Sequence, residues 1–141
     1  MRTAVALLAR RDFSRAELRG RLLHAAGASA DAAEIDRVLD TVQARGLLSE
    51  DRFVEGFIRT RVARYGPARL RHELLNRGVT QERIDKALRL YARDEYTAAR
   101  AVWLKRFKST PVDAREWARQ ARFLGVRGFS HEVIRKVLAG Q

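Results

Sequence analysis

The sequence predicts an all-α protein made of three tandem three-helix repeats that stack into an elongated, curved array. Two observations support this prediction. Apolar residues recur at helical spacing along almost the whole chain, and no stretch keeps the strict alternation of a strand. In addition, the phrase "RGVTQERIDKAL" at 77–88 returns as "RGFSHEVIRKVL" at 127–138. This period of about 50 residues gives three units, which we expect at residues 2–48, 49–92 and 93–141.

The first unit contains a clear helix start. Ser14 and Glu17 have the spacing of a capping box, directly before an apolar stripe that begins at Leu18. This segment, "SRAELRGRLLHAAG", resembles "GPARLRHELLNRGV" of the second unit, and "IDRVL" from Ile35 resembles "IDKAL" from Ile84. The following turn reads "LLHAAGASADAAEI" and lacks the Arg-Gly pair of the repeated phrase. We therefore expect this turn to differ from the other two.

The second unit shows three helix starts. Ser49 precedes two acidic residues, which favour a helix N-terminus, and then a stripe from Phe53 to Val62. Pro67 suits the first turn of the next helix, because proline lacks an amide that would have no helical partner there. Gly78 is typical of a helix end, and Thr80 can cap the helix that follows.

The third unit repeats this last joint. Its first helix carries a stripe that includes Trp103, and Gly128 and Ser130 take the places of the glycine and the cap. The repeated phrase therefore encodes a helix end, a tight turn and a new capped helix. We expect Ile134 on the inner face of this helix, as we expect Ile84 in the second unit.

Composition narrows the class of partner. The chain has 141 residues, and 29 basic against 17 acidic residues give a formal net charge of +12. This charge favours an anionic partner such as nucleic acid or an acidic protein surface, although an arginine-preferring genome would give the same excess. There is no cysteine, and no apolar run is long enough to cross a bilayer or to act as a convincing signal peptide. We expect a cytoplasmic monomer that does not contact a membrane.

Catalytic chemistry has little support. The three histidines lie in three different units, so no metal-binding spacing exists. The carboxylates lie mostly at helix starts or within a turn of an arginine, where dipole and ion-pair roles explain them. No glycine-rich phosphate loop is present. We therefore expect neither enzyme activity nor a cofactor.

Positive charge is the remaining functional signal. Arg115, Arg119 and Arg122 recur at i, i+4 and i+7 on one expected helix face, a like-charge arrangement that we call the arginine ladder. It is either a binding surface or a solvated face. Basic residues near helix C-termini have a second explanation in the helix dipole. The candidate contacts for a protein partner or nucleic acid are Arg59, Arg61, Arg64, Tyr65, Arg69, Arg71, Lys105, Arg106, Lys108, Arg115, Arg119, Arg122 and Arg127.

Aromatic residues could stack on bases, but most of them fall on apolar stripes. We expect core packing for most of this set: Phe53, Phe57, Trp103, Phe107, Trp117 and Phe123. Tyr65 is the exception, because it lies at a turn between arginines, where either role is open.

Three strings together resemble the RecX family of recombination regulators across essentially the whole chain. They are "LLARRDFSRAEL", "GLLSEDRFVEGFIRTRVARYGPARLRHELLNRGV" and "FLGVRGFSHEVIRKVL", in that order. The middle string is the most specific of the three. The resemblance implies three tandem three-helix repeats and a protein that binds RecA, the ATP-dependent recombinase that polymerises on single-stranded DNA.

Members of this family usually inhibit RecA, which limits filament growth, ATP hydrolysis, strand exchange and co-protease activity. The resemblance therefore implies the RecA–ssDNA filament as partner, with direct contact to single- or double-stranded DNA through the basic face as a further option. An alternative function is that of a stand-alone DNA-binding protein of the helix-turn-helix type, which would bind duplex DNA without a recombinase.

Overall fold

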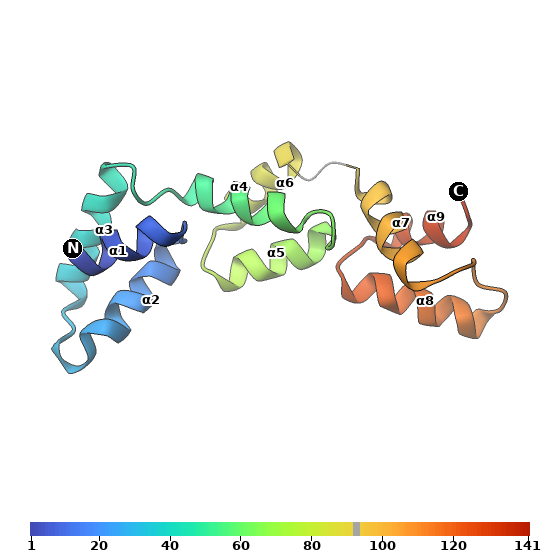
Figure 1. Ribbon diagram of the computed structural model, residues 1–141, viewed down its shortest axis with the longest axis horizontal. Helices are drawn as coiled ribbons and strands as arrows, with labels where there is room; N and C mark the ends of the chain where they lie inside the picture. The colour runs from blue at the N-terminus through green and yellow to red at the C-terminus, as the bar shows by residue number, and fades with distance from the viewer. Residues whose placement is uncertain (92–93) are drawn as a thin grey trace.

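The computed structural model describes residues 1–91 and 94–141, and in these residues the predicted all-helical class is confirmed. The helices form three groups in a row, so that the molecule is elongated and its two termini lie in the outer groups (Figure 1). In chain order the elements are α1 (Arg2–Arg10), α2 (Arg15–Ala26), a short 3-10 helix η1 (Gly27–Ser29), α3 (Ala32–Ala44), α4 (Glu50–Arg61), α5 (Pro67–Asn76), α6 (Gln81–Tyr91), α7 (Glu95–Arg106), α8 (Ala114–Val126) and α9 (His131–Leu138).

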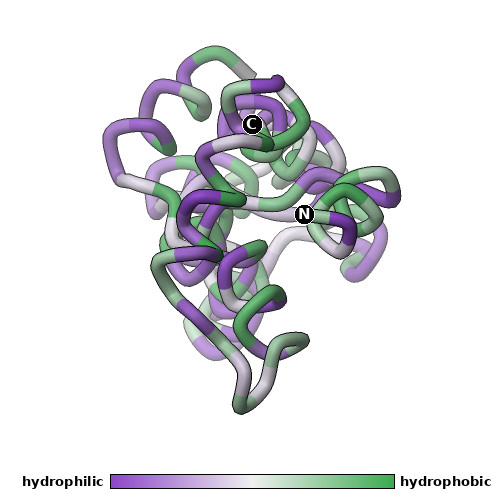
Figure 2. The backbone as a smooth tube through the Cα atoms, turned by 90° about the vertical axis from the view of Figure 1, so that its left-hand side faces the viewer, coloured by the Kyte–Doolittle hydropathy of each residue, from purple (hydrophilic) through white to green (hydrophobic). Residues whose placement is uncertain are grey.

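Each group of three helices has its own apolar core. Buried side chains between Ala4 and Leu48 form the first core, those between Phe53 and Leu88 the second, and those between Ala99 and Leu138 the third. Hydrophobic and hydrophilic stretches alternate along the helices, as expected for amphipathic helices that bury one face (Figure 2). The three cores lie within the predicted units. The exact unit boundaries stay a prediction, and the one between 92 and 93 lies outside the described residues.

Helix caps follow the predicted chemistry. Ser14 makes a complete capping box with Glu17, and the hydroxyls of Ser49 and Ser130 accept from the third residue of α4 and α9. Pro67 is the first residue of α5. The turn of the first repeat differs from the others, as predicted, because η1 fills it and the Asp31 carboxylate caps α3.

The repeats are joined by the turn that the repeated phrase encodes. In the first joint, the turn between α5 and α6 lies against the start of α2. The Ser14 hydroxyl donates a hydrogen bond of 2.6 Å to the carbonyl of Arg77, and the guanidinium of Arg77 lies 3.6 Å from Glu17. Gly78 has a φ of +81°, and a Cβ there would overlap the Cβ of Ala16. Only glycine gives this turn both its backbone conformation and its close approach.

The second joint repeats this arrangement one unit later. The turn between α8 and α9 lies against the start of α5, where the amide of Gly66 donates to the carbonyl of Arg127 at 2.7 Å. The amide of Ala68 donates to the carbonyl of Gly128 at 3.2 Å. Gly128 has a φ of +88°, and a Cβ there would lie 2.5 Å from the Cβ of Arg69. The repeated phrase thus closes a helix pair within one repeat and docks it on the repeat before.

Candidate interaction surface

The thirteen predicted contact residues fall into two groups. Some already contact other residues of the chain through ion pairs, carbonyls or aromatic rings, and the others are exposed without an ion pair among the described residues. In the second repeat, three of the arginines form ion pairs within their own repeat. Arg59 pairs with Glu55 at 3.2 Å, and Arg69 lies 3.9 Å from Glu73. Arg71 donates two hydrogen bonds to one oxygen of Asp85, at 3.1 and 2.9 Å. Because these arginines already pair with carboxylates of their own repeat, they are weaker candidates for contact with a partner.

Two further arginines are held by backbone carbonyls and aromatic rings. Arg127 donates to the carbonyl of Phe123 at 3.0 Å and lies 3.8 Å from the centre of its ring. Arg61 lies 3.8 Å from the ring centre of Phe57 in the same way. Both side chains are half-buried and lie at the C-terminal ends of their helices, where a positive charge favours the helix dipole.

Tyr65 is half-buried and packs against the second core, with the guanidinium of Arg69 at 4.3 Å from its ring. Its neighbour Arg64 is exposed and lies 5.7 Å from the same ring. The aromatic face of Tyr65 is therefore partly occupied by the protein's own cations. This geometry favours a packing role for Tyr65 over base stacking.

The arginine ladder lies exposed on α8, as its spacing predicts. Within the described residues, none of its three guanidinium groups lies within 4.0 Å of a carboxylate. The two acidic side chains beside the ladder have other roles. Asp113 caps α8 by accepting from an amide of its first turn, and Glu116 accepts from Gln120 at 3.3 Å. Within the described residues the ladder therefore forms no ion pair, although Asp113 and Glu116 line the same surface.

A single aromatic ring brings the end of α7 next to the ladder. The guanidinium of Arg119 lies 5.3 Å from the ring centre of Phe107, and that of Arg106 lies 5.5 Å from it. Lys105 and Lys108 flank this position in the chain and are exposed. We call the exposed basic residues of this part of the third repeat the basic surface: Lys105, Arg106, Lys108, Arg115, Arg119 and Arg122.

Core packing was expected for most of the aromatic set that includes Trp117, and Trp117 is an exception to it. Its side chain is 42% exposed, whereas Phe53, Phe57, Trp103 and Phe107 are buried. Trp117 stands beside small residues, Ala121 and Gly125, at the edge of a groove between α8 and α9. Sequence periodicity missed this groove because Trp117 lies at helical spacing from the apolar positions of α8.

The described residues contain no cluster of three or more side chains that could hold a metal ion, and none of their helices has the length and apolar character required to span a membrane. Among the described residues, the pKa values of Arg19, Asp36 and Asp94 are shifted. Arg19 and Asp36 are half-buried and pair with each other, and Asp94 is exposed. The titratable groups of the described chain thus show no buried acid–base pair, and the surface that stands out is the basic one.

Comparisons with known proteins place this chain in a family. Residues 49–88 match the model of the second three-helix domain of RecX, and residues 93–138 match the model of the third three-helix domain of RecX. Among solved structures, RecX from Lactobacillus salivarius superposes with a TM-score of 0.83 over 99% of this chain and 92% of its own, at 17% identity. A second regulatory protein RecX gives a TM-score of 0.80 over 96% of this chain and 71% of its own, at 19% identity. These two likenesses confirm the fold.

Curated relatives add similarity in sequence. The regulatory protein RecX of Leptothrix cholodnii is 48% identical over 96% of this chain and 84% of its own length. That of Pseudomonas fluorescens is 44% identical over 99% of this chain and 90% of its own. An identity at this level over nearly the whole of both chains, together with the two matching domain models, shows that this chain belongs to the RecX family of regulatory proteins.

Proposed function

We propose that this chain is a non-catalytic regulator that binds the RecA–ssDNA filament as a monomer and inhibits its ATPase, strand-exchange and co-protease activities. The observation that carries the proposal is the basic surface of the third repeat, whose ladder lacks internal carboxylate partners in a chain of the RecX family. Such a surface complements acidic groups of a protein filament or the phosphates of DNA held in it.

Rigid joints between the repeats support a mechanism based on several simultaneous contacts. Both joints are made by backbone or short side-chain hydrogen bonds and a glycine that approaches the preceding repeat closely. An elongated body with fixed joints can touch neighbouring recombinase subunits at once. After the first contact forms, the later contacts are effectively intramolecular, so the filament is favoured over free monomers.

Inhibition then requires no chemistry by this chain. A rod that bridges subunits resists the changes in their relative position that accompany ATP turnover. A basic surface in the groove of the filament also competes with duplex DNA, which strand exchange needs. Direct contact with single- or double-stranded DNA would add to this competition.

The arginine ladder can be tested by ATP hydrolysis of the cognate RecA on single-stranded DNA. We would titrate wild-type protein and a variant with Arg115, Arg119 and Arg122 replaced by alanine, at moderate and high salt. Three lost charge pairs of about 0.2–1 kcal/mol each should raise the half-inhibitory concentration by about 3- to 150-fold. A matched control, with exposed Arg10, Arg37 and Arg45 of the first repeat replaced by alanine, removes the same charge and should inhibit like wild type.

The outcomes separate the two functions. Full inhibition by the ladder variant removes the ladder from the mechanism. No inhibition by the wild type, together with tight and site-specific binding to duplex DNA in a gel-shift assay, would support the helix-turn-helix alternative instead. Inhibition by the wild type at fewer than one molecule per recombinase subunit supports binding along or at the end of the filament.

A further inference from the structure

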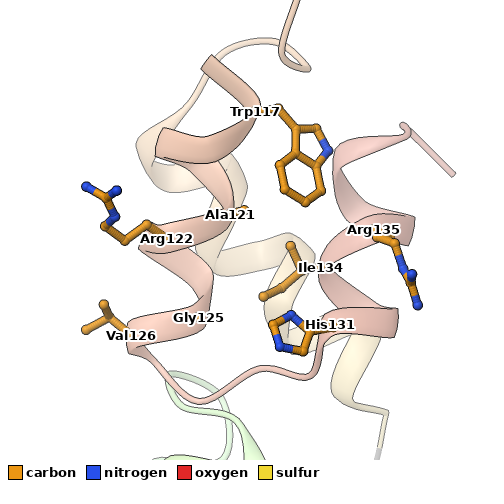
Figure 3. A pocket seen from close by; sticks show the side chains of 8 residues that line it. All are labelled: Trp117, Ala121, Arg122, Gly125, Val126, His131, Ile134 and Arg135. Carbon is orange, nitrogen blue, oxygen red and sulfur yellow. The ribbon is translucent and has the colours of Figure 1, made fainter. Parts of the chain in front are cut away.

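The third repeat has an open groove between α8 and α9, next to the basic surface. The groove has a volume of about 530 Å³, and Ala121, Gly125 and Ile134 contribute to its lining. The indole of Trp117 extends from α8 toward α9 above Ile134, and Arg122 and Arg135 lie on the two outer sides (Figure 3). An apolar floor with cationic edges is therefore open to a partner.

The other two repeats close the equivalent place with an ion pair. Alignment on the repeated phrase matches Ala121 with Arg71 and Arg135 with Asp85. In the second repeat, Arg71 and Asp85 bridge α5 and α6 at 2.9 Å. The first repeat has the same bridge between α2 and α3, where Arg19 lies 2.9 Å from Asp36.

The third repeat lacks both halves of this bridge. Its arginine position is occupied by Ala121, and its aspartate position by Arg135, which reverses the charge on the second helix of the pair. Gly125 replaces Leu75, which removes a side chain from the same edge. Among the described residues no carboxylate lies within ion-pair distance of Arg135 or Arg122. The groove is therefore open where the second repeat has a leucine side chain, and it carries positive charge where that repeat has a carboxylate.

We propose that this groove docks an acidic segment of a protein partner, with an apolar side chain that enters between α8 and α9 and a flanking carboxylate that pairs with Arg135 or Arg122. The partner would thus fill the place where an Arg–Asp ion pair links the two helices in the first two repeats. The apolar side chain would cover Trp117, which is 42% exposed, and Val126, which is 64% exposed. A central apolar anchor with charged groups at its edge is the usual arrangement of a binding hot spot.

The lining favours a protein segment over nucleic acid. Base stacking needs an open aromatic face, but the space in front of the Trp117 indole is a groove lined by Ala121 and Ile134 rather than a flat platform (Figure 3). The exposed arginine ladder on the adjacent face remains the better site for phosphates. Arg122 lines both the groove and the ladder, so the two sites are continuous.

The proposal rests on the proposed function for its probe, the RecA–ssDNA filament. Two variants close the groove by copying the second repeat. Gly125→Leu introduces the leucine of that repeat without a change in charge, and a Cβ at Gly125 would make only an ordinary contact of 3.9 Å with Ile134. A double variant, Ala121→Arg with Arg135→Asp, rebuilds the ion pair. The matched control is Gly20→Leu, on an exposed helix face of the first repeat where a Cβ would meet no atom within 4 Å.

Binding is measured by cosedimentation with the filament, and the fold of each variant by circular dichroism. We expect both groove-closing variants to bind the filament about tenfold more weakly or worse, while Gly20→Leu binds like wild type. A single-stranded oligonucleotide without recombinase should bind wild type and groove-closing variants equally.

The results that overturn the proposal are distinct from those that overturn the proposed function. If folded groove-closing variants bind the filament as tightly as wild type, the groove is not a docking site, and the proposed function stands. If they lose oligonucleotide binding to the same extent as filament binding, the groove serves nucleic acid and the proposal fails. If wild type itself does not sediment with the filament, the proposed function fails, and this inference with it.

Discussion

Replacement of Gly128 by alanine tests whether the glycine turn locks the third repeat onto the second. Alanine at a φ of +88° costs about 1–2 kcal/mol in backbone conformation alone. Its Cβ would also overlap the start of α5, at 2.5 Å from the Cβ of Arg69 and closer still to the Arg69 amide nitrogen. These neighbours are largely backbone atoms that cannot rotate away, so the turn has to move.

Movement of the turn breaks the joint. The two hydrogen bonds from Gly66 and Ala68 to this turn, at 2.7 and 3.2 Å, contribute about 1 kcal/mol each. The expected loss of stability for Gly128→Ala is therefore roughly 3–4 kcal/mol. Gly46→Ala is the matched control, because Gly46 has a φ of +76° but a Cβ there would meet no atom within 4 Å. It should lose only about 1–2 kcal/mol.

Urea denaturation followed by circular dichroism measures both losses, and small-angle X-ray scattering measures the arrangement of the repeats. Gly128→Ala should widen the distribution of interatomic distances under native conditions, and Gly46→Ala should leave it unchanged. If the two variants differ in free energy of unfolding by less than about 0.5 kcal/mol and scatter identically, the turn does not hold the repeats together.

Two other predictions concern polar contacts inside single repeats. Gln120→Leu should lower the free energy of unfolding by about 1–3 kcal/mol. The indole N–H of Trp103 donates to Gln120 at 2.8 Å in the buried third core, and the variant removes this acceptor. Equal urea midpoints for variant and wild type would contradict this prediction. A hydrogen bond from Arg19 holds the pKa of Asp36 below its ordinary value of 3.8, so this carboxylate stabilises the fold above that pH and the effect is lost as the pH falls through the lowered pKa. The melting temperature of Asp36→Asn should therefore lie below that of wild type near neutral pH and approach it in strong acid, and a difference that is constant with pH would refute the role of this ionisation.

Local signals in the sequence predicted most of the fold. The capping box at Ser14, the proline at the start of α5 and the glycines of the repeated phrase all act where the spacing places them, because caps and turns depend on residues within a few positions of one another. The docking of the Gly128 turn on Gly66 was outside the reach of such signals. These two residues are far apart in the chain, and no periodicity links a turn to the start of an earlier helix.

The candidate site shows the same limit. Charge spacing predicted the exposed ladder, but it could not distinguish free arginines from those that have partners. Glu55 and Arg59 pair at i, i+4 spacing, whereas Arg52, three residues before Glu55, pairs at 2.7 Å with Asp12 of the preceding repeat. The groove beside Trp117 could have been predicted from the sequence, because Ala121 and Arg135 stand where the second repeat has Arg71 and Asp85. Comparison of the repeats position by position shows where the third one has lost its ion pair.

The two joints also give the array a direction. In each of them a turn of one repeat meets the helix start of the repeat before it, so the same pair of surfaces is used twice in the same sense. A contact of this kind is heterologous and does not close on itself. Because equivalent residues meet at both joints, an added unit would extend the array in the same direction. Gene duplication would lengthen such an array in whole units and would leave each existing joint unchanged.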